Sequence, residues 1–153
     1  MTPDFHTSLR SHAFLKGLSE GQIYELSQLA QEASFEPLEE ILAEGQRSSA
    51  FYLVLSGSVA VELRTAQYGI CVEALGAGEV FGWSSLLDRQ DTLFQVRARE
   101  HTEALLFDGG ALKALLRRDP VLGVEFLQRT LRVVAGRVKA TELRFAEMCG
   151  IRV

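Results

Sequence analysis

The residue pattern with the clearest chemical potential is a serine pair that directly follows the only tryptophan of the chain. It reads Phe81-Gly82-Trp83-Ser84-Ser85. Serines that open a short helix present hydroxyls and backbone N–H groups together, and such groups suit an anion. Serine pairs are common in turns, so the pattern by itself is a weak signal. It marks this segment as a candidate binding site.

Residues that could support catalysis or hold a metal are scattered. The three histidines, His6, His12 and His101, show no metal-ligand spacing, and the cysteines, Cys71 and Cys149, are too few for a cluster. The serine pair has no evident base beside it, and Gly-x-Ser-x-Gly does not occur. We therefore expect no enzyme, metal or cofactor. We expect His6 and His12 at the surface and Cys71 in the core.

Composition and charge restrict the class of protein further. The chain has 153 residues, of which 47% are hydrophobic and 24% charged, with a net charge of −4. The longest apolar run, residues 50–55, is far shorter than the roughly 20 residues that cross a bilayer. The N-terminus does not resemble a signal peptide, and two cysteines favour a reducing compartment. We expect one cytoplasmic domain without a membrane segment, and no direct DNA binding by its acidic surface.

Two kinds of periodicity divide the chain into three zones. Ser19 and Gln22 have the spacing of a helix capping box, and residues 9–14 suggest a shorter helix before it. Apolar and polar residues alternate over 59–64 and 94–99, so these strands have one buried face and one solvent-exposed face. Glycines separate several such short strands, which favours a sandwich or barrel.

The third zone contains a long helix with an apolar seam. Asp119-Pro120 is a typical helix start, and no strong breaker follows before Met148. Apolar residues, with one polar exception, step alternately by four and three: Leu127, Leu131, Val134, Val138, Thr141, Phe145 and Met148. A seam this regular favours pairing with a second helix and hence a homodimer, whereas packing on its own domain would need a broader stripe.

The order of several motifs resembles the cyclic nucleotide-binding domain of the Crp/Fnr type. Residues 52–59 (YLVLSGSV) are similar to its central hairpin, and residues 78–82 (GEVFG) to the start of its phosphate-binding cassette. The long last helix is similar to its dimerisation helix. The resemblance implies a mainly β fold with flanking helices, a β-roll of jelly-roll (double-stranded β-helix) topology. It predicts one domain over 1–153, with N-terminal helices at 1–32, the β-roll at 33–107 and C-terminal helices at 109–149.

The cassette departs from the family pattern at the positions that bind the ligand. The resemblance implies a glutamate for the ribose hydroxyl, an arginine for the cyclic phosphate, then a hydroxyl residue and an alanine. Counting back from the strand 94–98 places Thr92 at the arginine position and Leu93 at the hydroxyl position. Phe94 takes the place of the alanine, and Trp83 that of the glutamate. Loss of the arginine removes a bidentate, charge-assisted contact to phosphate.

The candidate site follows from these positions, with one open alternative. The loop is one residue shorter than in the family pattern, so a shifted register could bring Arg89 to the phosphate. Arg97 is expected on the solvent-exposed strand face with Gln95 and Arg99. The candidate site residues are Phe81, Gly82, Trp83, Ser84, Ser85, Thr92, Leu93 and Phe94.

These observations predict a non-catalytic regulatory or sensor domain. We expect it to act through a non-cognate ligand or a protein partner and not to bind cyclic AMP in the usual way. The alternative is a cyclic nucleotide receptor with a rewired site. The ligand that the resemblance raises is a cyclic nucleotide, and the expected assembly is a homodimer through the last helix. Transcription factors of the family that the chain resembles carry a helix-turn-helix domain after the long helix. No such motif is evident in this sequence, so no operator binding is expected.

Overall fold

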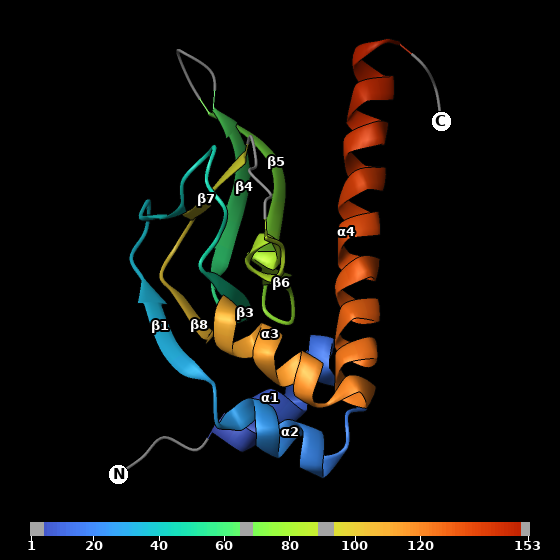
Figure 1. Cartoon of the computed structure of the whole chain (residues 1–153). Coiled ribbons are helices and arrows are strands. Elements are labelled where there is room, and N and C mark those ends of the chain that lie inside the picture. Colours follow the sequence, from blue (N-terminus) through green and yellow to red (C-terminus); the bar gives the residue numbers. More distant parts are fainter. Residues whose placement is uncertain (1–4, 65–68, 89–93, 151–153) are drawn as a thin grey trace.

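The fold is mainly β with flanking helices, as the sequence predicts (Figure 1). The computed structural model describes residues 5–64, 69–88 and 94–150. Its strands form two four-stranded antiparallel sheets, ordered β1-β8-β3-β6 and β2-β7-β4-β5. The strand bounds are β1 Gln31–Phe35, β2 Glu40–Leu42, β3 Ala50–Ser56, β4 Ser58–Arg64, β5 Gly69–Gly76, β6 Val80–Phe81, β7 Phe94–Ala98 and β8 Thr102–Asp108.

The segment 52–59 is not a paired hairpin, which corrects one expectation. β3 pairs with β6 and β8, whereas β4 pairs with β5 and β7, so the chain changes sheets at Gly57. Gly57 has a φ of 89°, and an added Cβ would lie 2.3 Å from the His101 carbonyl oxygen. Only glycine fits this tight crossover between the two layers.

The N-terminal helices are short and cover one end of the β-roll (Figure 1). They are α1 Phe5–Ser11, the 3₁₀ helix η1 Ala13–Leu15 and α2 Glu20–Ser27. The capping box predicted for α2 is confirmed: Ser19 Oγ accepts from Gln22 N at 3.2 Å, and Gln22 Oε1 accepts from Ser19 N at 2.9 Å.

His12 is buried, so the expectation that it lies at the surface is wrong. Its Nδ1 accepts from Phe14 N, which caps η1, and its Nε2 donates to the Val54 carbonyl at 2.9 Å. Burial lowers the pKa of His12, although the bond to Val54 opposes this. The imidazole thus ties the N-terminal segment to β3 in its neutral form.

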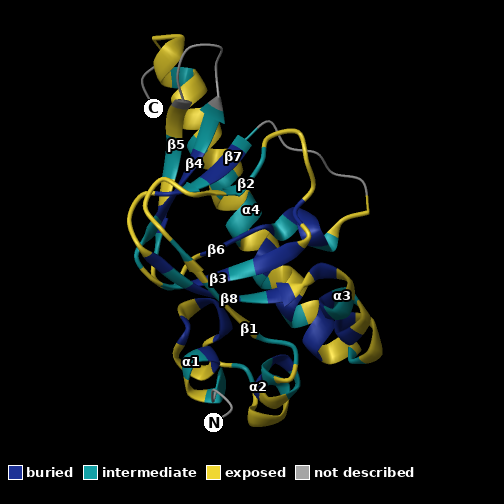
Figure 2. Cartoon of the chain, turned by 90° about the vertical axis from the view of Figure 1, so that its left-hand side faces the viewer, coloured by how far each residue is buried: buried dark blue, intermediate teal, exposed yellow. Residues whose placement is uncertain are grey.

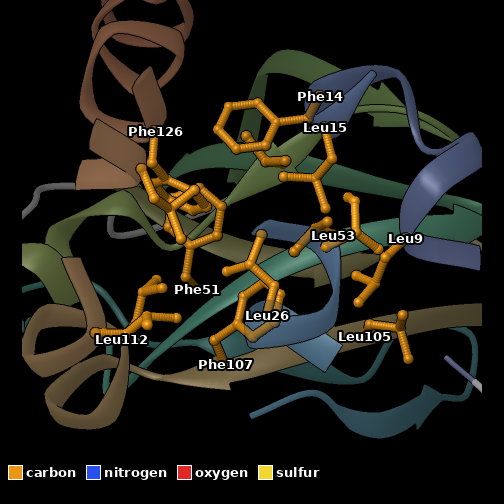
Figure 3. Close-up of a cluster of buried hydrophobic side chains, with 14 of the residues drawn as sticks. Leu9, Phe14, Leu15, Leu26, Phe51, Leu53, Leu105, Phe107, Leu112 and Phe126 are labelled. Carbon is orange, nitrogen blue, oxygen red and sulfur yellow. The ribbon is translucent and has the colours of Figure 1, made fainter. Parts of the chain in front are cut away.

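The main apolar core joins the sheet, the N-terminal helices and the C-terminal helices (Figure 3). Phe51 packs against Phe126 with ring centroids 5.1 Å apart, and Phe14 meets Phe126 at 5.3 Å in an edge-on arrangement. Both geometries are favourable for aromatic pairs. This contact fixes the first turns of the last helix against the β-roll.

The last helix, α4 Pro120–Met148, follows α3 Gly109–Arg118 at a tight corner. Asp119 caps it by accepting from Leu122 N at 3.2 Å, as the Asp-Pro pair predicts. Gly123 allows the close corner, because an added Cβ would lie 2.3 Å from the Leu116 carbonyl oxygen. Beyond its first turns α4 rises beside β5 (Figure 1), and its C-terminal turns are exposed (Figure 2).

Two further expectations about single residues fail. Cys71 is exposed on β5 and not in the core. Gln95 is buried to 2% exposure, although the strand alternation predicts a solvent-exposed side chain. Its amide donates to Glu62 Oε1 at 2.9 Å, which stabilises it among neighbouring polar side chains.

Among the described helices, none is long and apolar enough to cross a membrane.

Candidate ligand-binding site

A cavity of about 430 Å³ lies between the β2-β7-β4-β5 sheet, η2 and α4. η2 is the 3₁₀ helix Trp83–Leu86. This volume is within the range of small-molecule sites, which are mostly apolar with a few polar groups. The cavity is lined by Leu42, Val61, Phe81, Gly82, Trp83, Ser84, Phe94, Val96, Val134, Arg137, Val138, Thr141 and Glu142.

The backbone at Gly82 shapes the floor of the cavity. Gly82 has a φ of 81° and caps η2, and an added Cβ would lie 2.4 Å from the Ala50 carbonyl oxygen. Only glycine combines this left-handed conformation with such a close approach. The turn places Trp83 and Ser84 on the cavity wall directly after β6.

The two serine hydroxyls have different roles. Ser84 Oγ accepts from Ser48 N at 2.9 Å, while its side chain borders the cavity. Ser85 Oγ donates to the Gly82 carbonyl at 2.7 Å, is buried and does not line the cavity. Ser85 therefore stabilises the turn, and of the two serines Ser84 is the one that borders the cavity.

Aromatic and aliphatic side chains make the walls largely apolar. Trp83 and Phe94 are both half-buried and both line the cavity. Phe81 also lines the cavity, and its ring stacks on Tyr52 with centroids 4.6 Å apart and a 7° interplanar angle. Burial raises the pKa of Tyr52, which keeps this phenol neutral.

Helix α4 supplies the charged groups of the cavity. Arg137 Nε lies 3.1 Å from Glu73 Oε2 on β5, with side-chain exposures of 15% and 30%. Thr141 Oγ1 donates to the Arg137 carbonyl at 2.9 Å, and Glu142 borders the cavity from an exposed position. The cavity thus has an apolar interior and an arginine at its helical wall.

Comparison with known proteins places this geometry in a family. The family model described as "Cyclic nucleotide-binding domain" matches residues 32–119. The chain belongs to this family. This confirms the resemblance seen in the sequence, and two residues of the motif 78–82, Phe81 and Gly82, line the cavity.

Curated relatives of this cyclic nucleotide-binding domain include ion channels. The chain is 31% identical over 134 residues to "Putative potassium channel protein RPA4233" of Rhodopseudomonas palustris, covering 87% of this chain and 31% of that protein. It is 28% identical over 153 residues to Potassium channel AKT1 of Oryza sativa subsp. indica, covering 93% of this chain and 16% of that protein. The chain therefore spans less than a third of either relative.

Solved structures share the fold of the domain. A cyclic nucleotide-binding domain from Methylobacillus flagellatus superposes with a TM-score of 0.81 at 21% identity, over 94% of this chain and 84% of that one. Thermus thermophilus Catabolite Activator Protein gives 0.72 at 25%, over 90% and 63%. The regulatory subunit of a cAMP-independent protein kinase A from Trypanosoma brucei, as a triple mutant bound to cAMP, gives 0.62 at 24%, over 74% and 45%.

The structure brings together five of the eight candidate site residues of the domain. They are Phe81, Gly82, Trp83, Ser84 and Phe94, and all five line the cavity. Ser85 does not, for the reason given above. Thr92, Leu93 and the alternative Arg89 lie outside the described residues.

Arg97 is committed to contacts away from the cavity. Its Nε lies 3.2 Å from Glu62 Oε1, and its Nη1 donates to the Leu38 carbonyl at 2.9 Å. It does not line the cavity, in agreement with its expected place on the other strand face.

Sequence reasoning missed the contribution of Arg137 and Glu142. Both lie next to positions of the apolar seam of α4, and the sequence pattern predicts only a partner helix against that seam. Val134, Val138 and Thr141, three seam positions, also border the cavity. The only sign of this cavity-lining role in the sequence is that both charged residues lie beside seam positions.

An ion pair anchors the segment that leaves η2. Lys113 Nζ on α3 lies 3.1 Å from Asp88 Oδ1, and Arg47 Nη1 donates to the Leu87 and Asp88 carbonyls at 2.7 and 2.8 Å. The hydrogen bond from Lys113 lowers the pKa of Asp88.

In the part of the chain that is described, no three His, Cys, Asp or Glu side chains gather as a metal site.

Proposed function

We propose that this domain is a non-catalytic regulatory module that responds to a ligand in the cavity between the β-roll and α4, or to a partner protein. We further propose that it does not bind cyclic AMP in the usual way. The observation that carries this proposal is that Trp83 and Phe94, which the sequence count assigns to the family's glutamate and alanine positions, both line the cavity.

The physical basis is the mismatch between this wall and a cyclic nucleotide. Two large rings occupy volume and offer little hydrogen bonding to a phosphate or a ribose hydroxyl. Losing the charge-assisted arginine contact of the usual cassette could cost about 2–5 kcal/mol, or one to four decades in affinity. The arginine that is present, Arg137, comes from a different element and already faces Glu73.

The Trypanosoma brucei structure supports the proposal by analogy. That subunit is described as cAMP-independent, and its cAMP-bound form carries a change of threonine to arginine beside changes of glutamate and valine to alanine. The present chain has Thr92 at its counted arginine position. A threonine at that position is consistent with a domain that does not bind cyclic AMP.

The second candidate is a cyclic nucleotide receptor with a rewired site. It is favoured by one observation: the cavity has a suitable volume and an arginine, Arg137, at its wall. In this alternative Arg137 would replace the missing cassette arginine.

Titration with cyclic AMP and cyclic GMP tests the two candidates. Trp83 is the only tryptophan, so its emission reports on the cavity directly. We expect no saturable change up to millimolar nucleotide, and no saturable heat by calorimetry. A micromolar midpoint for cyclic AMP that cyclic GMP competes away would contradict the proposal and favour the receptor.

We also propose that α4 mediates a homodimer. Several seam residues are at least half exposed, at 50% for Leu127, 66% for Leu131, 50% for Val138, 66% for Phe145 and 85% for Met148. So many exposed apolar side chains along one helix are unusual on a monomer. A second copy of the same seam would bury them by knobs-into-holes packing.

Light scattering tests the dimer. Leu131→Glu should dissociate it because the change buries an unpaired charge. Gln128→Glu adds the same charge at an exposed position of α4 away from the seam and should leave the mass unchanged. A monomer mass for the unmodified chain at every concentration would contradict the proposal.

We also propose that the domain is cytoplasmic. Both cysteines are free and exposed, which suits a reducing compartment.

A further inference from the structure

Arg137 has hydrogen-bonding capacity that the described protein does not use. Its Nε faces Glu73 Oε2, but neither Nη1 nor Nη2 donates a hydrogen bond to any part of the chain that the structure describes. The side chain is only 15% exposed and lines the cavity. A guanidinium presents its donors as a rigid fork that matches a carboxylate.

The surroundings of Arg137 define the rest of a ligand. Apart from Ser84, Thr141 and Glu142, the lining side chains are aliphatic or aromatic. An apolar body can therefore fill the cavity without leaving polar groups unpaired. A sugar or a ring nitrogen placed against the same walls would lose its hydrogen bonds to water.

We infer that the cavity takes a ligand with an apolar, ring-sized body and a single carboxylate, and that the carboxylate is received by the free Nη groups of Arg137. This inference rests on the proposed function, because it assumes that the cavity is a ligand site. It adds the chemical class of the ligand and the residue that selects it.

The acidic neighbours of Arg137 are compatible with an anion. Glu73 contacts the Nε edge of the guanidinium, so the Nη edge stays open. Glu142 is exposed, and water screens its charge. Both carboxylates lower the anion affinity below that of an unpaired arginine, so the apolar body must supply much of the binding free energy.

Ligand binding would also weaken the Arg137–Glu73 ion pair between α4 and β5. A ligand carboxylate and Glu73 would share one guanidinium, which weakens the hold of Glu73 on the helix. Occupancy of the cavity is thereby linked to the position of the exposed half of α4, where the seam lies.

A pair of probes with the same shape and different charge tests the inference. 1-Naphthylacetate carries a carboxylate, and 1-naphthylacetamide replaces it with a neutral amide. By calorimetry the acid should bind at least about tenfold more tightly than the amide, as expected for a charge-assisted hydrogen bond. Arg137→Gln should remove this preference and leave the affinity for the amide unchanged.

Glu73→Gln is the matched control. It breaks the same ion pair but keeps the guanidinium, so the preference for the acid should persist or increase. If Glu73→Gln removes the preference as fully as Arg137→Gln does, Arg137 acts through the ion pair and the inference is wrong. Equal binding of acid and amide, or binding of neither, overturns it as well. Tight binding of cyclic AMP would overturn the proposed function instead, so the two failures are distinguishable.

Discussion

The two halves of α4 share one helix and have opposite environments. In the first half Leu122, Phe126 and Thr130 are buried against the core. Arg129 reinforces this half, since its Nη1 donates to the Phe14 and Lys16 carbonyls at 2.7 and 2.8 Å. Among the described residues, the only ion pair between the second half and the β-roll is Arg137–Glu73. The first half therefore fixes the helix, and the second half has fewer contacts that hold it to the β-roll.

Truncating one phenylalanine in each half should show the difference between the two halves most clearly. Phe126→Ala should destabilise the fold by about 3–5 kcal/mol, because it leaves a cavity among Phe14, Phe51 and their neighbours. Phe145→Ala should change stability by less than about 0.5 kcal/mol in the monomer, because its side chain is exposed. Urea unfolding at low protein concentration measures both. Equal losses would show that the second half is packed as tightly as the first.

The two glycines of α4 offer a matched pair with opposite signs. Gly123→Ala should destabilise by about 1–3 kcal/mol, because the new Cβ meets the Leu116 carbonyl oxygen. Gly136→Ala should stabilise by about 0.5–1 kcal/mol, because no atom lies within 4 Å of its added Cβ and alanine favours helix. Thermal unfolding of both variants checks this. A loss at Gly136 would mean that the second half lies closer to the β-roll than described.

Restoring the family's polar residues tests whether the cavity beside the second half corresponds to the usual phosphate site. Trp83→Glu combined with Thr92→Arg should raise the affinity for cyclic AMP by at least about tenfold over either single change, because a ribose acceptor and a charge-assisted phosphate contact return together. Phe94→Ala should be needed as well if the ring occupies the phosphate volume. Calorimetry measures the affinity. No gain in the triple variant would contradict the alignment of the cassette.

The smallest effect concerns His12. It holds the segment whose Phe14 and Lys16 carbonyls accept hydrogen bonds from Arg129 in the first half of α4. Burial lowers its pKa below the ordinary 6.5, so the folded state prefers neutral imidazole. This contribution is fully present above pH 6.5. As the pH falls below 6.5, the unfolded state takes up a proton first and stability is lost, by at most about 1.4 kcal/mol per pH unit.

Urea unfolding from pH 8 to 5 measures the loss. His12→Asn should flatten it. His101 is the control, because the hydrogen bond to Glu103 raises its pKa, and its contribution is lost with rising pH instead. If His12→Asn leaves the slope below pH 6.5 unchanged, another group carries it.

Local signals made parts of this structure predictable. The capping box at Ser19 and the cap at Asp119 depend on neighbours within three residues, so the sequence alone reveals them. The strands 58–64 and 94–98 follow from their alternation, and motif order indicated the family. The same alternation fails for Gln95, because Glu62 on the adjacent strand provides a half-buried polar partner that a single strand does not reveal.

The sequence by itself determined the β-roll with flanking helices, the turn at 81–85 and the apolar seam of α4, because each depends on short-range periodicity or on a family motif. Only the tertiary structure decided that His12 is buried, that Ser85 turns back to the Gly82 carbonyl, and that Arg137 joins Trp83 at one cavity. Arg137 and Trp83 lie far apart in the chain, and their meeting depends on how the first half of α4 docks on Phe51. Such long-range packing has no periodic trace in the sequence, which is why the charged wall of the site appears only in the fold.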